Sequence, residues 1–185
     1  MQTTPPSQFA LSPQQKAPET AASRGSFRTT AMIETPTIVT TTPQYTAKIH
    51  VVVSWDDIKT VMGPTIQEVY QAIGAQGGTP AGPWFTHHLR RPTDTFDFEA
   101  CVPVALPIQP AGRVQPGEWP SMKVARTVYH GGYEGLGEAW GEFLDWIEKQ
   151  GLKTADDLWE VYLVGPEAGD DASIYRTQLN RQVLS

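Results

Sequence analysis

The residues best suited to chemistry lie in the segment DLWEVYLVGP, residues 157–166. Its apolar and aromatic character predicts a β-strand, yet Glu160 stands in the middle of it, directly after Trp159 and two residues before Tyr162. A carboxylate among aromatic side chains is costly to bury unless another group pairs with it. Such a carboxylate could anchor a cation. If burial raised its pKa toward neutrality, it could also act as a general acid or base.

Strand alternation divides this segment into two faces, one with Trp159, Val161 and Leu163 and the other with Leu158, Glu160, Tyr162 and Val164. We expect the all-apolar face to pack on a helix and the Glu160 face to line a cleft. The alternative is that Glu160 is an edge or solvated residue, since Glu is almost never fully buried without a partner.

A second strand, WFTHHL at residues 84–89, can be aligned with the first by placing Trp84 opposite Trp159. This alignment puts Phe85 and His87 on the cleft face. The cleft would then combine a carboxylate, a phenol, an imidazole and a benzyl ring. Mostly apolar walls with few polar anchors are typical of a small-molecule pocket.

The elements that must position these side chains occur twice in the order β–α–β–β. In the first half we expect a strand at 45–55, a helix at 63–78 with Pro64 in its first turn, and strands at 84–89 and 96–106. A Pro- and Gly-rich connector, residues 108–120, follows. In the second half we expect a strand at 121–130, a helix at 132–151, and strands at 158–164 and 173–183. The packing stripe of this helix would be Leu136, Trp140, Phe143, Leu144 and Ile147.

These elements predict an α+β fold of two βαββ modules, about residues 32–108 and 109–185. One βαββ unit leaves a sheet face uncovered, so we expect the two modules to pack in a pseudo-two-fold arrangement around a central ligand cleft. Residues 1–31 are rich in Ser, Thr, Gln, Pro and Ala without helix or strand periodicity, which predicts a disordered tail.

Composition limits the function classes. The 185 residues carry a formal net charge of −6, which repels phosphate backbones, so we expect no direct nucleic-acid partner. Cys101 is the single cysteine and no secretory signal pattern is visible, which favours the reducing cytoplasm. No apolar run is long enough for a membrane span. Adjacent His87 and His88 would point to opposite faces of a strand, and no cofactor motif is present, so we expect neither a metal nor a cofactor.

The second half resembles a known family. The runs VYHGGYEGLGEAWGEFLDWIEKQGL, WEVYLVGP and YRTQLNRQV are similar to the H-G-x-Y, A-W, G-L, W-E-x-Y-L-x-x-P and T-E-L pattern of GyrI-like, or AraC-type effector-binding, small-molecule domains. The resemblance implies the two-module fold. It also implies that the glutamate of W-E-x-Y, here Glu160, anchors a ligand. The candidate contacts around it are Tyr162 and Tyr133 of the motif, together with Phe85 and His87 from the strand alignment.

The resemblance implies three functions, and the sequence does not decide between them. The first is a stand-alone domain that binds small hydrophobic or cationic aromatic molecules. The second is a hydrolase of strained, cyclopropane-containing compounds, in which Glu160, Tyr162 and Tyr133 would be catalytic. The third is contact with a protein partner, such as gyrase or a regulator, as in gyrase inhibitors.

Overall fold

The computed structural model describes residues 33–185, and the predicted disordered tail, residues 1–31, lies outside the described residues. The described chain contains eight strands, two α-helices and three short 3₁₀ helices. The elements follow one another as β1 (Thr37–Thr40), β2 (Gln44–Ser54), α1 (Ile58–Ala75), β3 (Phe85–His88), β4 (Thr95–Pro103), β5 (Gln115–Trp119), β6 (Lys123–His130), η1 (Tyr133–Gly135), α2 (Leu136–Lys149), β7 (Leu158–Val164), η2 (Pro166–Ala168), η3 (Ala172–Ile174) and β8 (Arg176–Gln182). The expectation of a mixed α and β fold is confirmed.

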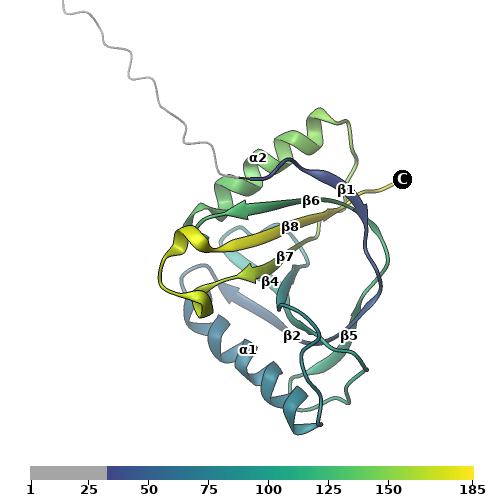
Figure 1. The fold of residues 1–185 in the computed structure, drawn as a ribbon, viewed down its shortest axis with the longest axis vertical. Coiled ribbons are helices and arrows are strands. Elements are labelled where there is room, and N and C mark those ends of the chain that lie inside the picture. The colour runs from purple at the N-terminus through teal and green to yellow at the C-terminus, as the bar shows by residue number, and fades with distance from the viewer. Residues whose placement is uncertain (1–32) are drawn as a thin grey trace, which may run out of the picture.

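All eight strands form one antiparallel sheet in the order β1-β6-β8-β7-β3-β4-β2-β5. Strands β1 and β2 stand far apart in this order, although residues 41–43 alone connect them. A flat sheet would separate them by about 29 Å at 4.8 Å per strand, whereas the connection spans roughly 14 Å at most. The sheet must therefore curl, and Figure 1 shows the strands curving from β1 and β6, beside α2, to β2 and β5, beside α1.

Residues 120–122, between β5 and β6, also cross from one end of the strand order to the other, as residues 41–43 do between β1 and β2. The two crossings are hydrogen-bonded to each other at Thr41. Its hydroxyl donates to the carbonyl oxygen of Pro120 at 2.8 Å and accepts the backbone N–H of Met122 at 2.9 Å. The backbone N–H of Thr41 donates to the carbonyl oxygen of Met122 at 2.8 Å. These bonds hold the two ends of the curled sheet close together.

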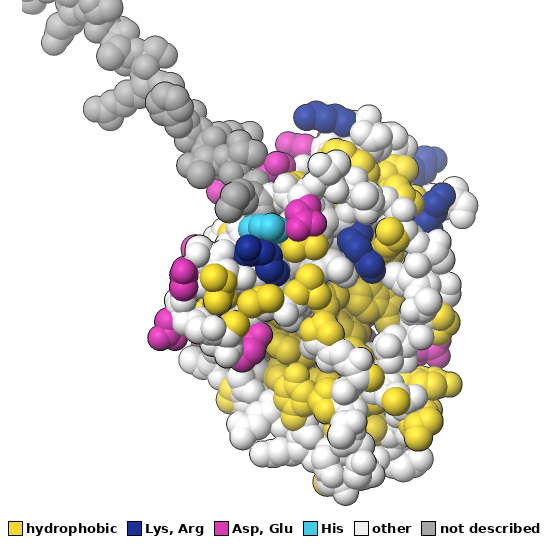
Figure 2. All heavy atoms as spheres, viewed as in Figure 1, with side chains coloured by type: hydrophobic (Ala, Val, Ile, Leu, Met, Phe, Trp, Pro, Cys, Tyr) yellow, Lys and Arg dark blue, Asp and Glu magenta, His cyan; other side chains and the backbone are white. Residues whose placement is uncertain are grey.

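Both helices pack on the same face of the sheet, which we call the helix face. Helix α1 buries Ile66, Val69 and Ile73 against side chains of β2 and β4. Helix α2 buries Trp140, Phe143 and Ile147 against β6, β7 and β8, in a second cluster with Leu158 and Leu179. In the view of Figure 2, hydrophobic side chains gather over the middle and lower part of the molecule. Among the described residues no helix is long and apolar enough to cross a bilayer.

A third cluster lies on the opposite face of the sheet, which we call the pocket face. It contains the buried side chains of Phe85, Cys101, Trp119, Met122, Val124, Trp159 and Val161. Cys101 is buried, and burial raises the pKa of its thiol. The sheet is therefore a shared layer with an apolar surface on each side.

Two element boundaries differ from the sequence prediction. Helix α1 begins at Ile58, so Pro64 lies inside it rather than in its first turn. The predicted connector also contains a strand, β5, which pairs with β2 and is the last strand of the sheet. Pro116 is compatible with this strand because an edge strand has a side where no partner needs its missing N–H.

Candidate functional site

Glu160 lies on the helix face and is 8% exposed. The indole Nε1 of Trp140, on α2, donates to its Oε1 at 2.7 Å, and the hydroxyl of Tyr162 donates to its Oε2 at 2.8 Å. The Nε2 atom of His88 lies 3.6 Å from the same Oε2. The alternative of a solvated edge residue is wrong, because β7 is an inner strand between β3 and β8 and Glu160 is buried with partners.

The hydrogen bonds around Glu160 have a fixed direction. An indole N–H can only donate and an ionised carboxylate can only accept, so Tyr162 uses its proton on Glu160. The Tyr162 oxygen is 3.1 Å from Oγ1 of Thr86, which must then be the donor in that bond. Oγ1 of Thr86 is in turn 3.1 Å from Nε2 of His88, so Nε2 must carry a proton. The Nδ1 atom of His88 is buried without a partner among the described residues.

This network lowers the pKa of Glu160 below its usual range. Burial alone would raise that pKa, but the nearby His88 imidazole and the bonds from Trp140 and Tyr162 outweigh it. The pKa of Tyr162 is raised well above its usual value by burial and by the Glu160 charge. The site therefore holds a buried, ionised carboxylate beside a neutral phenol. The pKa near neutrality that a general acid would need is not present.

Aromatic rings extend from Tyr162, which donates to the carboxylate. The Trp84 ring stacks on Tyr162 with centroids 4.0 Å apart, and Tyr133 meets Tyr162 edge-on at 5.8 Å. Tyr175 lies 5.6 Å from Tyr133. Tyr133 remains 38% exposed, and burial together with Glu167 raises its pKa to about 12. We call Trp84, Tyr133, Tyr162 and Tyr175 the aromatic rim of Glu160.

The structure does not bring Phe85 and His87 to this site. In the β3–β7 register Thr86 is opposite Glu160, whereas Phe85 and His87 are opposite Val161 and Trp159 on the pocket face. The alignment of Trp84 with Trp159 is wrong by an odd number of residues, since Trp84 shares the helix face with Tyr162. The expectation that the all-apolar face of β7 packs on a helix is also wrong, because Trp159 and Val161 lie in the cluster on the pocket face, whereas the Glu160 face meets α2.

His87 has a different set of partners on the pocket face. Its Nδ1 is 3.2 Å from a Glu99 oxygen and its Nε2 is 2.8 Å from an Asp157 oxygen. Both nitrogens must donate to these carboxylates, which makes the ring an imidazolium. Burial opposes that charge, but the two carboxylates prevail and raise the His87 pKa. Glu99 also binds Lys48 at 2.6 Å, and despite its burial the pKa of Glu99 falls to about 2.

Sequence reasoning missed Thr86, His88 and Trp84 as neighbours of Glu160, and it assigned Trp140 to helix packing alone. The tripeptide Thr86-His87-His88 contains the signal, because alternation places Thr86 and His88 together and His87 opposite. The confirmed part is that the two adjacent histidines point to opposite faces. Alternation alone does not give the register between β3 and β7, and that register decides which face of β3 meets Glu160.

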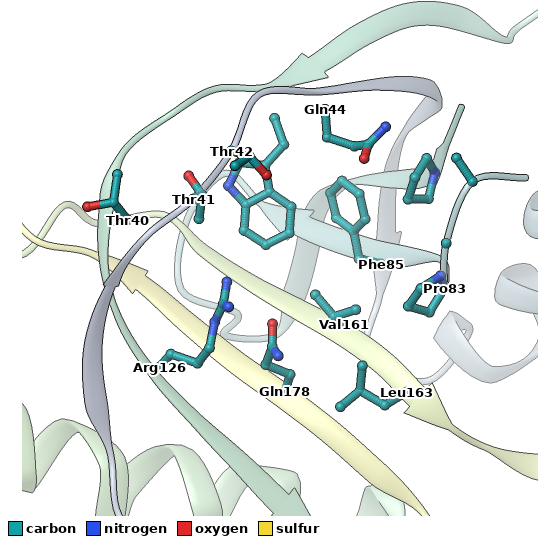
Figure 3. Close-up of a pocket in the computed structure, with 14 residues that line it drawn as sticks. Thr40, Thr41, Thr42, Gln44, Pro83, Phe85, Arg126, Val161, Leu163 and Gln178 are labelled. Carbon is teal, nitrogen blue, oxygen red and sulfur yellow. The ribbon is translucent and has the colours of Figure 1, made fainter. Parts of the chain in front are cut away.

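A pocket of the described chain lies on the pocket face, away from Glu160. It has a volume of about 380 Å³ and is lined by residues of the β1–β2 crossing, of the segment before β3, and of the central strands. Figure 3 shows Phe85, Val161, Leu163, Arg126 and Gln178 around it. Of the predicted site residues, Phe85 lines this pocket, whereas Glu160, Tyr162 and Tyr133 do not.

Solved structures share this fold at low sequence identity. The C-terminal domain of EcmrR is 18% identical, with a TM-score of 0.73 over 82% of this chain and 98% of that domain. In the EcmrR–DNA complex the identity is 19% and the TM-score 0.72, and the match spans 57% of the EcmrR chain. SAV2435 bound to tetraphenylphosphonium is 12% identical, with a TM-score of 0.56 over 82% of this chain and 95% of that one.

A hydrolase from Listeria innocua also shares the fold, at 11% identity and a TM-score of 0.56 over 80% of this chain and 91% of that one. No curated protein sequence matches the chain closely enough to indicate a relationship. A family model does match. It covers residues 34–179, which is most of the chain and ends within β8. The chain therefore belongs to the GyrI-like small molecule binding domain family.

Proposed function

We propose that the protein binds small cationic aromatic molecules on the helix face, with Glu160 as the anchor of the ligand's charge. One observation carries the proposal: Glu160 is a buried carboxylate with a lowered pKa whose two hydrogen-bond donors, Trp140 and Tyr162, are both neutral. Among the described residues its salt-bridge partner is the His88 imidazole, whose Nε2 lies 3.6 Å from Oε2, and no lysine or arginine pairs with it. A desolvated cation at this point would gain much more than it would in water.

The aromatic rim supports the second half of the proposal. The faces of aromatic rings carry negative potential, so each ring adds about 0.5–2 kcal/mol of attraction for a cation held against it. Trp84 and Tyr162 are already stacked, and Tyr133, which is 38% exposed, extends the aromatic surface to the exterior. A flat or propeller-shaped aromatic cation matches this arrangement. Because Glu160 is 8% exposed, binding requires part of this cover to open.

The pKa of Glu160 limits the hydrolysis alternative. Its lowered value opposes a general acid, which needs a carboxyl that keeps its proton near neutral pH, and leaves hydrolysis only the general-base role of an ionised carboxylate. SAV2435, which shares the fold, binds tetraphenylphosphonium, an aromatic cation. This likeness supports the ligand class without fixing the ligand.

We also propose that the fold consists of two related βαββ modules, with the ligand held where they meet. The strand order supports this, because β6-β8-β7 on one side of the β7–β3 junction mirrors β2-β4-β3 on the other. Each triplet carries one helix on the same face. The outer strands are exchanged: β1 pairs with β6 and β5 pairs with β2. Glu160 and Thr86 face each other across the junction.

A cytoplasmic location, favoured by the single cysteine, is part of the same proposal.

The test is titration calorimetry of the full chain with tetraphenylphosphonium. The wild type should bind, and Glu160→Gln should lose tens- to thousands-fold in affinity, as expected when one partner of a close charge pair is removed. The matched control is Glu138→Gln, which removes the same charge from the exposed surface of α2 and should bind normally. Mass spectrometry of the ligand should find it unchanged. Equal binding by all three proteins, or a converted ligand, would refute the proposal.

A further inference from the structure

The pocket on the pocket face is lined by one positively charged side chain and by several neutral hydrogen-bond donors. Arg126 is the one charged residue in its lining. Its guanidinium is half-buried, and burial is the sole cause that lowers its pKa. None of the salt bridges among residues 33–185 involves Arg126. The described part of the chain therefore leaves this half-buried positive charge without a counter-charge.

Asn180 fixes the direction in which two of the lining residues donate. Nε of Arg126 donates to Oδ1 of Asn180 at 2.6 Å, so the amide nitrogen of Asn180 must donate elsewhere. It donates to Oε1 of Gln178 at 3.3 Å. The amide nitrogen of Gln178 is then left as a donor. Asn180 itself is fully buried, so this arrangement is held rigidly. Figure 3 shows Arg126 and Gln178 side by side at the pocket.

A further donor in the lining is also unsatisfied. Trp119 is 9% exposed, and its indole Nε1 is buried with no hydrogen-bond partner among the described residues. A buried N–H without a partner costs free energy comparable to a lost hydrogen bond. The rest of the wall includes Phe85, Val161 and Leu163, which are apolar.

We propose that this pocket is a second ligand site, which takes a small monoanion, a carboxylate on an aromatic or alicyclic body. The carboxylate accepts from Arg126 and Gln178, and the body lies against Phe85 and Val161. A single guanidinium with neutral donors around it balances one negative charge. The volume of about 380 Å³ lies within the usual range of about 300–1,000 Å³ for small-molecule sites. The site is separate from the Glu160 site, is opposite in charge, and does not depend on the function proposed for that site.

The experiment compares 2-naphthoate with the neutral, nearly isosteric 2-naphthamide by titration calorimetry of the full chain. The wild type should prefer the carboxylate by about tenfold or more, since a hydrogen bond to a charged group is stronger than one between neutral groups. Arg126→Met should remove this preference. Arg181→Met is the matched control, because Arg181 is also a half-buried arginine but lies outside the pocket lining, and it should keep the preference.

Gln178→Glu gives an independent readout should Arg126→Met fail to fold. The new carboxylate would pair with Arg126, occupy the donors and reduce 2-naphthoate binding by about tenfold or more, with 2-naphthamide affected much less. Tetraphenylphosphonium binding, which reports the Glu160 site, should be the same in Gln178→Glu and the wild type. The proposal is overturned if the wild type shows no preference for the carboxylate, or if the preference survives in Arg126→Met or in Gln178→Glu.

Discussion

At the scale of single residues, the main feature is a carboxylate that is charged although it is buried. Glu160 receives one hydrogen bond from Trp140 and one from Tyr162, and the chain of donors continues through Thr86 to His88. Every direction in this chain follows from the fact that an ionised carboxylate only accepts. The protonation state of Glu160 therefore sets the proton position on each of its neighbours.

This dependence predicts a change of histidine tautomer. In the wild type the Nε2 atom of His88 must carry the proton it donates to Thr86. In Glu160→Gln the new amide nitrogen can donate to the Tyr162 oxygen, which reverses Tyr162 and Thr86 and turns Nε2 into an acceptor. Nitrogen-15 NMR of the imidazole should show a proton on Nε2 in the wild type and on Nδ1 in the variant. The same tautomer in both proteins would contradict the directed chain.

At the scale of the elements, α2 and β7 position the carboxylate, and both were predicted from the sequence. The apolar stripe of α2 predicted five packing residues; Trp140, Phe143 and Ile147 are buried, and Leu136 and Leu144 are partly buried. The strand LWEVYLV is β7 with the predicted bounds. Sequence reasoning did not show that Trp140 also donates a hydrogen bond, because that depends on how α2 lies across β7.

Trp140→Phe tests this second role of α2. The phenyl ring can still pack on Phe143, but Oε1 of Glu160 loses its donor, so we expect a loss of about 1–3 kcal/mol in the free energy of unfolding, measured with urea. Trp146→Phe, a half-buried change on the same helix without a recorded side-chain hydrogen bond, should cost less.

The same variant has a pH signature. Because the folded-state pKa of Glu160 is lowered, its contribution to stability is present at neutral pH and is lost as the pH falls through that pKa. Trp140→Phe raises that pKa, so its stability should fall less between neutral and acidic pH than that of the wild type. Parallel pH profiles would show that Trp140 is packing alone.

The faces of β7 and the strand β5 could not be predicted from local patterns. Both faces of β7 are rich in apolar side chains, so alternation shows which residues share a face but not which face meets the helix. That is decided by the pairing with β3, where a shift of one residue exchanges Thr86 for Phe85 opposite Glu160. Strand β5 contains Pro116 and Gly117, which are typical of loops, and it is stabilised by pairing with β2.

At the scale of the whole molecule, one curled sheet separates two candidate sites of opposite charge. The helix face holds the negative charge of Glu160, and the pocket face holds the positive charge of Arg126. His87 joins the two halves of the chain on the pocket face, because it lies in β3 and binds both Glu99 in β4 and Asp157 just before β7. Its charge therefore stabilises the junction between β3 and β7.

This bridge predicts a loss of stability at higher pH. The folded-state pKa of His87 is raised above the ordinary histidine value of about 6.5, so its contribution is complete below about that pH and is lost as the pH rises through the raised pKa. Urea unfolding of the wild type should show this decline, and His87→Gln should lack it. His50→Gln, which changes an exposed histidine paired with Asp97, should keep the wild-type profile. A decline that persists in His87→Gln would assign it to another group.

The central claim is that the charge of Glu160, rather than the shape of its surroundings, selects the ligand. The most direct measurement is a four-way comparison of tetraphenylphosphonium and neutral triphenylphosphine oxide, each titrated into the wild type and into Glu160→Gln. The substitution should weaken binding of the cation by about 2–5 kcal/mol and leave binding of the neutral molecule nearly unchanged. If both ligands weaken equally, or neither weakens, Glu160 is a structural residue and the charge anchor is refuted.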